Sequence, residues 1–272
     1  MSEPRPQETS GQSVLYDVDA GVGTITLNRP DSMNSLDTST KEQLLAAVQR
    51  ASADPEARCV VITGTGRAFC VGQDLNEHIE NITTRSLPEV WATVDEHYSP
   101  IALGIATMEK PVVAAVNGVA AGAGLSIAMA CDWRVAADTA GFSTAFAGIG
   151  LSCDTGCSWT LPRLVGPTKA MELLLWPRTV KADEALEIGL VNWVFPADRL
   201  TGEVADIADR LAAGPTLAFS AMKQAVRHAA THTLEESLAF EAQQMTRTGR
   251  SADHLNAVQS FVAKEKPTFT GA

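Results

Sequence analysis

Two segments rich in small residues carry the strongest chemical signal in this sequence. The first, residues 68–75, reads AFCVGQDL, and the second, residues 117–125, reads NGVAAGAGL. Each follows an apolar stretch that predicts a strand and precedes a predicted helix, where the first amides have no helical partner. Two such amides that point at one position would bind a developing oxyanion, and each donor is worth about 10²–10³ in rate.

The alternative interpretation of these turns is purely structural. Gly and Ala also permit a tight turn and a close approach of a helix to a strand, and a single turn of this kind favours that interpretation. Two turns of this composition, each placed between a strand and a helix, favour a binding site instead.

The composition limits the possible partners. The chain has 272 residues, 45% of them hydrophobic, which is enough for one large domain with or without a helical appendage. Its net charge of −11 argues against a nucleic-acid partner, because phosphate binding requires clustered Lys and Arg, but it leaves room for one anionic ligand in a locally basic pocket. The apolar runs are too short to span a bilayer, so we expect no membrane partner.

The Cys and His residues indicate a protein of the cytoplasm without a metal site. The five Cys residues form no CxxC pair, which favours reduced, buried thiols and a cytoplasmic location. No basic flank followed by an apolar run is present near the first residues, so we expect no signal peptide. His228 and His232 are spaced i,i+4, but neither an HExxH pattern nor a nearby acidic ligand accompanies them, so we expect no metal site.

Apolar strands and glycine turns alternate along the first half of the chain. Residues 22–28, 58–63 and 111–117 predict strands, and a helix is expected after Asp37, its candidate N-cap. The unit of apolar strand, glycine turn and helix occurs twice, about 50 residues apart, which indicates a repeating β–β–α architecture. Further helices are expected over most of 75–108, from the second glycine turn to about residue 130 and over 182–188, with a last short strand at 190–195.

The C-terminal region has a different character. Residues 215–264 predict three amphipathic helices after a break at Gly214-Pro215. This region has too little apolar surface for a core of its own, so we expect it to pack on a neighbouring subunit. We therefore divide the chain into a disordered lead-in at 1–12, a core at 13–205 and a helical oligomerisation region at 206–272.

In combination these motifs resemble the crotonase superfamily, also called the enoyl-CoA hydratase/isomerase family, from about residue 14 to the C-terminus. The resemblance implies an α/β fold, a spiral of ββα repeats with a C-terminal helical trimerisation region. It also implies acyl-CoA thioester substrates, coenzyme A only as part of the substrate and no permanently bound cofactor, and a homotrimer or a dimer of trimers. The motifs that carry it are Asn28-Arg29-Pro30 with Asn34-Ser35-Leu36, residues 68–75, residues 110–124, Cys131-Asp132, residues 146–150 and residues 161–166.

The resemblance assigns the two oxyanion amides to Gln73 and Ala123. Gly is common at the second position in the family, but Ala offers the same backbone N–H in a narrower pocket. The segment around residues 68–76 is expected to line the path of the adenine and pantetheine. The implied contacts of coenzyme A are Arg29, Ala68, Cys70, Gly72, Gln73, Asp74, Leu75 and Gly122, and the candidates for phosphate contacts are Arg29, Lys41, Arg67 and Lys264.

The family's hydratases use two glutamates, and neither is present here. Their positions are occupied by Ser126 and Phe146, so a two-glutamate addition of water is not expected. Asp154, eight residues after Phe146, falls where enoyl-CoA isomerases and the ring-epoxide isomerase of phenylacetyl-CoA breakdown hold their acid. The 4-chlorobenzoyl-CoA dehalogenases hold a nucleophilic Asp there, but their His and Trp positions fall at about Ser99 and at Phe146, which disfavours dehalogenation.

Asp154 is therefore the expected catalytic acid and base. Burial in an apolar pocket would raise its pKa and make it a better base toward a C–H bond acidified by the thioester. The alternative is an N-cap for residues 155–161, and the two roles are compatible. The predicted function is isomerase-type proton transfer, and the alternatives are hydration through Asp154 and water, or non-catalytic binding of acyl-CoA.

Overall fold

The computed structural model describes residues 12–272, so the lead-in expected at 1–12 lies almost wholly outside the described residues. The fold is α/β and contains two sheets. The larger sheet has the strand order β1-β2-β3-β5-β7-β10, in which only β1 and β2 pair antiparallel. Its strands are β1 (Val14–Asp19), β2 (Val22–Leu27), β3 (Cys59–Gly64), β5 (Val112–Val116), β7 (Trp133–Ala137) and β10 (Trp193–Phe195).

A second, smaller sheet is built from very short strands in the order β4-β6-β8-β9. The first three strands run parallel, and β9 pairs antiparallel with β8. These strands are β4 (Ala68–Cys70), β6 (Val119–Ala121), β8 (Gly141–Ser143) and β9 (Val180–Lys181). Because β3, β5 and β7 of the larger sheet are each followed by a strand of the smaller one and then by a helical segment, the expected ββα repeat is confirmed.

The strands of the larger sheet are apolar because helices cover them. Every residue of β5 is buried, and so are the first four residues of β3. The helix α1 (Thr38–Ala53) begins at Asp37, whose side chain accepts a hydrogen bond from the Thr40 amide at 2.7 Å, as expected of an N-cap. The helix α5 (Ala123–Ala130) is buried along its whole length, which suits a helix that lies between two sheets.

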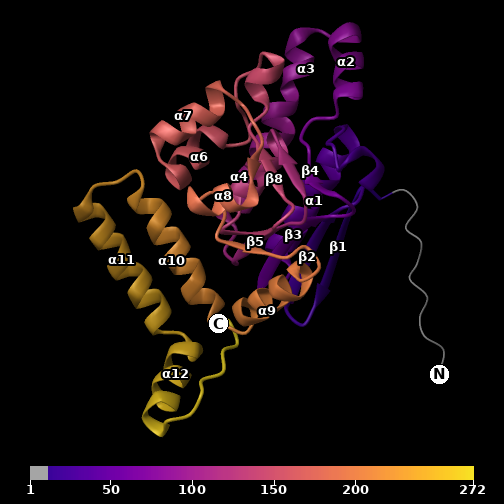
Figure 1. The fold of residues 1–272 in the computed structure, drawn as a ribbon. Helices are drawn as coiled ribbons and strands as arrows, with labels where there is room; N and C mark the ends of the chain where they lie inside the picture. Colours follow the sequence, from indigo (N-terminus) through magenta and orange to yellow (C-terminus); the bar gives the residue numbers. More distant parts are fainter. Residues whose placement is uncertain (1–11) are drawn as a thin grey trace, which may run out of the picture.

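The segment between the two glycine turns is almost entirely helical. It contains α2 (Leu75–Thr84), α3 (Leu87–Thr93), one turn of π-helix (Val94–Tyr98) and α4 (Ser99–Thr107). In Figure 1, α2 and α3 stand side by side at the top of the molecule, beyond the edge of the sheets. The Ser86 capping box with Glu89 begins α3, so the turn between these two helices is fixed locally.

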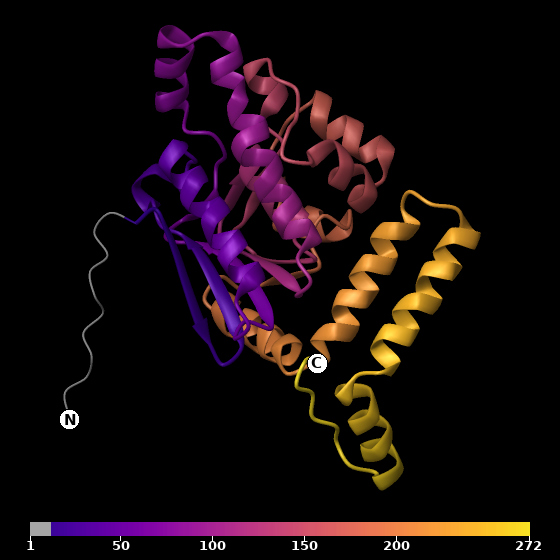
Figure 2. The ribbon, with the colours of Figure 1, turned by 180° about the vertical axis from the view of Figure 1, so that it is seen from behind.

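Seven further helices complete the chain after the last repeat. Figures 1 and 2 both show α10 and α11 side by side and standing away from the sheets, with α12 at their end. The expected boundary at 205–206 falls inside α9, which packs against β3, β5 and β7 and so belongs to the core. The helices are α6 (Cys157–Val165), α7 (Pro167–Leu175), α8 (Ala182–Glu187), α9 (Leu200–Ala212), α10 (Thr216–Ala229), α11 (Leu234–Gly249) and α12 (Ala252–Ala263).

The C-terminal tail returns from α12 to the core. Arg58 donates one hydrogen bond to the carbonyl of Phe269 at 2.9 Å and another to the hydroxyl of Thr216 at 3.2 Å, so it joins β3 to both ends of the helical arm. Within residues 12–272, no helix is long and apolar enough to cross a membrane.

Candidate active site

A cavity of about 480 Å³ lies between the first glycine turn, the α3 and π-helix segment, and the loop that ends at Asp154. The aromatic residues Trp91, Tyr98 and Phe146 line it; Tyr98 and Phe146 are buried, whereas Trp91 and Arg67 are exposed. The cavity is lined by Asp31, Ser32, Met33, Ser35, Arg67, Val71, Gln73, Asp74, Leu75, Asn76, His78, Trp91, Thr93, Val94, Tyr98, Gly122, Ala123, Ala145, Phe146, Ile149, Leu151 and Asp154.

The two glycine turns meet at this cavity because β4 and β6 are parallel neighbours, so their carboxyl ends share an edge of the small sheet. A Cβ atom on Gly72 would lie 3.2 Å from the amide nitrogen of Ala123, which measures how closely the turns approach. Ala123 is the first residue of α5, and Gln73 follows β4. Within residues 12–272, neither of their N–H groups donates to a backbone or side-chain acceptor.

The first glycine turn is held in place by the segment that precedes α1. Leu36 donates its amide hydrogen to the Gly72 carbonyl at 2.8 Å and accepts the Asp74 amide at 3.1 Å, so Gln73 lies between two fixed neighbours. The side chain of Asn34 donates to the Ala68 carbonyl at 2.8 Å. The Asn-Ser-Leu motif at 34–36 therefore positions the turn from behind.

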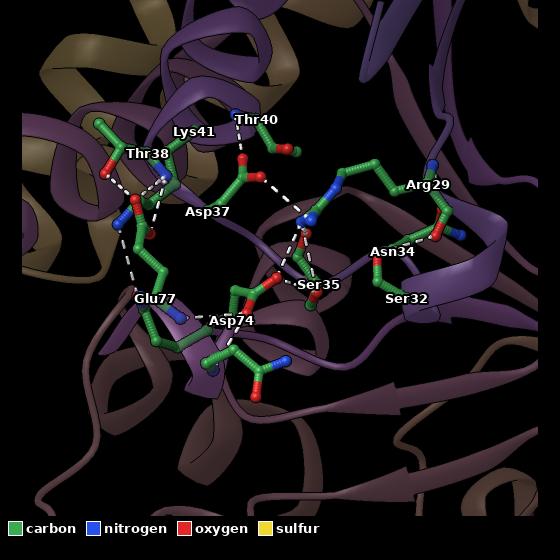
Figure 3. Close-up of polar contacts among 12 residues, drawn as sticks. Arg29, Ser32, Asn34, Ser35, Asp37, Thr38, Thr40, Lys41, Asp74 and Glu77 are labelled. Atoms are coloured by element: carbon green, nitrogen blue, oxygen red, sulfur yellow. Dashed lines mark hydrogen bonds and ion pairs between the residues drawn. The ribbon is translucent and has the colours of Figure 1, made fainter. Parts of the chain in front are cut away.

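Asp74 closes this support network, which Figure 3 shows in close-up. Its carboxylate accepts from the Ser35 hydroxyl at 2.9 Å and from Arg29 at 3.1 Å, and it caps α2 through the Asn76 amide at 3.1 Å. Burial alone would raise the pKa of Asp74, but these hydrogen bonds and the Arg29 charge lower it. Arg29 also pairs with Asp37 at 3.1 Å, so its guanidinium is already held by two carboxylates.

Asp154 also lines this cavity and comes from the loop before α6. Burial raises the pKa of Asp154, and the Thr155 hydroxyl, which donates to the carboxylate at 2.7 Å, and the charge of Lys41 oppose that shift. The expectation that Asp154 caps residues 155–161 is wrong. The N-cap of α6 is Gly156, which has no side chain, and the Asp154 carboxylate binds Thr155 instead.

The sequence of the whole described core matches a known family. The model of the enoyl-CoA hydratase/isomerase family matches residues 17–272. The chain belongs to this family. It is 39% identical to the 1,2-epoxyphenylacetyl-CoA isomerase of Escherichia coli K12 over 95% of this chain and 98% of the relative.

Other members of the enoyl-CoA hydratase/isomerase family are similarly close. The crotonyl-CoA hydratase of Syntrophomonas wolfei is 32% identical over 95% of this chain and 98% of the relative. The solved structure of an enoyl-CoA hydratase of Bacillus anthracis superposes with a TM-score of 0.90 at 30% identity, over 96% of this chain and 100% of that one. The family acts on coenzyme A thioesters, so this chain is an acyl-CoA enzyme of the enoyl-CoA hydratase/isomerase family.

Ser126 and Phe146, the positions at which the resemblance places the glutamates of the family's hydratases, carry no acid. Phe146 lines the cavity with its ring. Ser126 is fully buried, and its hydroxyl donates back to the Gly122 carbonyl at 3.1 Å in its own helix. The carboxylates on the cavity wall are Asp31, Asp74 and Asp154, and Asp74 is held by Arg29.

Several residues expected to contact coenzyme A lie behind the wall of the cavity. Ala68 and Cys70 are fully buried in β4, and Gly72 is buried between the turns, so these three residues support the turn and do not line the cavity. Lys41 is only 2% exposed, so its expected role as a surface contact for phosphate is wrong. The lining residues among the expected set are Arg67, Gln73, Asp74, Leu75 and Gly122.

One wall of the cavity, contributed by α3 and the π-helix, was not predicted from the sequence. Trp91, Thr93, Val94 and Tyr98 line the cavity and come from a stretch that was assigned only as helical. A signal was present for Tyr98, because it lies three and seven residues before the buried Ile101 and Ile105, on the same face of a helix.

Proposed function

We propose that this enzyme is an isomerase that moves a double bond along an enoyl-CoA by proton transfer through Asp154. One observation carries the proposal: Asp154 faces the same cavity as the two N–H groups of Gln73 and Ala123, while Ser126 and Phe146 hold no second acid. One carboxylate opposite an oxyanion hole is sufficient for isomerisation, because the same group takes the proton and returns it.

The reaction follows from the positions of these groups. The Asp154 carboxylate removes a proton from C2 of a 3-enoyl thioester, and the electron pair moves into the carbonyl to form a dienolate. The N–H groups of Gln73 and Ala123 stabilise the oxygen that gains this charge. Protonated Asp154 then returns the proton to C4, and the double bond ends between C2 and C3. Its raised pKa favours the first step, because a carboxylate with a raised pKa is a stronger base toward the C2 proton.

A ring epoxide is the second candidate substrate, and the aromatic wall favours it. Trp91, Tyr98 and Phe146 line the cavity, which suits a flat ring as well as a short chain. The 39% identity to a 1,2-epoxyphenylacetyl-CoA isomerase supports the same choice. In both cases the thioester oxygen would occupy the oxyanion hole and Asp154 would act on the acyl group.

The test is a product analysis by mass spectrometry, with trans-3-hexenoyl-CoA, crotonyl-CoA and 1,2-epoxyphenylacetyl-CoA as substrates. We expect isomerised products without addition of water, and we expect Asp154→Asn to lower the rate by about 10²–10⁴. Asp198 is exposed, lies just before α9 and does not line the cavity, so Asp198→Asn should keep the wild-type rate. Rapid hydration of crotonyl-CoA, or full activity of Asp154→Asn, would overturn the proposal.

A further inference from the structure

Lys41 lies in an unusual place for a lysine, in the first turn of α1 and behind the first glycine turn (Figure 3). Its side chain is 2% exposed, and its ammonium donates to the Thr93 hydroxyl at 2.8 Å and to the side-chain carbonyl of Gln73 at 3.4 Å. No carboxylate in residues 12–272 forms a salt bridge with it. A buried ammonium without a paired carboxylate is costly, so an apolar side chain would suit this site better if only stability mattered.

Tyr98 approaches the same atom of Gln73 from the π-helix. Its side chain is 2% exposed, and its hydroxyl donates to the side-chain carbonyl of Gln73 at 2.5 Å. The Lys41 ammonium lies 5.4 Å from the centre of the Tyr98 ring. Two donors from two different elements therefore hold the side-chain oxygen of the residue whose backbone N–H faces the thioester.

The side chain of Gln73 separates two spaces. A smaller cavity of about 150 Å³ adjoins the first, and Gln73, His78 and Thr93 line both. Lys41 lines the smaller cavity, so it reaches the acyl-CoA space through Gln73 and Thr93 and not directly. An alanine at position 73 would offer the same N–H but no side chain for Lys41 and Tyr98 to hold.

We propose that Lys41 and Tyr98 are positioning residues that hold Gln73, so that its N–H stays aimed at the thioester oxygen, and that the Lys41 ammonium adds positive charge behind the oxyanion hole. This inference rests on the proposed function, since it assigns the Gln73 amide to the oxyanion hole. A charge that is shielded from water acts more strongly over a few ångströms than an exposed one. The same ammonium favours the ionised form of Asp154.

The charges around these two groups come from several elements. Burial lowers the pKa of Lys41, the carboxylates of Glu77, Asp37 and Asp154 raise it, and Arg85 lowers it. The charge of Lys41 lowers the pKa of Asp154, and the charge of Asp154 in turn raises the pKa values of Tyr98 and Cys157. The other ionisable side chains that line the smaller cavity with Lys41 are Glu42, His78, Arg85, Glu89, Glu96 and His97.

The experiment measures the oxyanion hole without turnover. The absorption of 4-(dimethylamino)cinnamoyl-CoA moves to longer wavelength when its thioester oxygen accepts hydrogen bonds, so the shift at saturation reports how well the hole is aligned. We expect a red shift with the wild type and a smaller one with Lys41→Met and with Tyr98→Phe. Lys41→Arg, which keeps the charge, should recover part of the shift. Lys110→Met is the matched control, because Lys110 is also partly buried but donates only to the carbonyls of Ala51 and Asp54.

The pH dependence of isomerisation supplies the second readout. Loss of the ammonium should raise the pKa of Asp154, so the rise of kcat with pH should move to higher pH in Lys41→Met. We expect kcat to fall by about tenfold or more with KM within about threefold, because the change acts on the transition state and not on coenzyme A binding. Lys41→Arg should keep the wild-type pH profile.

The outcomes separate this inference from the proposed function. A red shift that depends on Lys41 and Tyr98 in an enzyme that isomerises nothing would overturn the proposed function alone. A wild-type red shift and pH profile in Lys41→Met would overturn the inference alone, and so would an equal loss in Lys110→Met. If Lys41→Met does not fold, the red shift measured with Tyr98→Phe tests the inference instead. A wild-type red shift in that variant would contradict the positioning of Gln73 by Tyr98.

Discussion

At the scale of single residues, Asp154 is a place where catalysis and stability oppose each other. Burial raises its pKa in the folded chain, so the ionised carboxylate destabilises the fold, and stability falls as the pH rises through that folded-state pKa. We expect Asp154→Asn to melt at a higher temperature than the wild type at pH 7. The melting temperature should rise by about 2–4 °C for each kcal/mol gained in the free energy of unfolding. The gain should vanish below the pKa of an unfolded Asp. A lower melting temperature at pH 7 in calorimetry would contradict this account.

Thr155 tunes the same carboxylate through one hydrogen bond. Thr155 is buried and has a φ of +53°, and its hydroxyl donates to the Asp154 carboxylate at 2.7 Å. Thr155→Val keeps the shape and removes the donor, so the pKa of Asp154 should rise and the rise of kcat with pH should move to higher pH. The lost hydrogen bond should lower stability by about 0.5–1.5 kcal/mol. Thr160→Val, whose hydroxyl binds the Gly156 carbonyl, serves as the control with an unchanged pH profile.

At the scale of elements, the contact between α5 and β4 fixes the distance between the two glycine turns. A Cβ atom on Gly124 would lie 2.1 Å from the carbonyl oxygen of Cys70, and no side chain there can relieve the clash. We expect Gly124→Ala to lower the free energy of unfolding by about 3 kcal/mol or more, or to prevent folding. Gly202→Ala in α9 meets no atom within 4 Å and should instead stabilise by about 0.5–1 kcal/mol. Urea unfolding of both variants measures the contrast.

The elements that the sequence predicted well are those with strong local patterns. β2, β3 and β5 are runs of β-branched and apolar residues, and the break at Gly214-Pro215 separates α9 from α10 as expected. β1 was missed because its acidic residues alternate with apolar ones at a half-exposed edge of the sheet. The strands β4, β6 and β8 have only three residues each, which is too short for a period to be detected.

The candidate site divides in the same way. The turns around Gln73 and Ala123 were predictable, because a glycine-rich strand-to-helix junction is a local signal. The burial of Lys41 was not predictable, since a lysine on an amphipathic helix ordinarily faces water. Here α3, whose last residue Thr93 accepts a hydrogen bond from Lys41, packs over it. Contacts of this kind depend on which distant segment packs on a helix, and a single sequence does not encode that locally.

At the scale of the whole molecule, the helical arm α10–α12 presents apolar side chains to solvent in a single chain. Val226 is 73% exposed and Phe261 is 84% exposed, and both lie on helices with an otherwise amphipathic pattern. An apolar surface of this extent is typical of a contact between subunits. The other exposed apolar residues of the arm are Met222, Leu234, Leu238, Met245, Leu255, Val258 and Val262.

We therefore predict that the protein assembles as a homotrimer or a dimer of trimers through this arm. Light scattering after gel filtration should give a multiple of the 28.8 kDa chain, and a Val226→Glu, Phe261→Glu double variant should shift the mass toward the single chain. The reason is that each buried, unpaired carboxylate in an interface costs several kcal/mol. Gln243→Glu adds the same charge at an exposed polar position of α11 and should leave the mass unchanged. A wild type that elutes as a single chain would contradict the prediction.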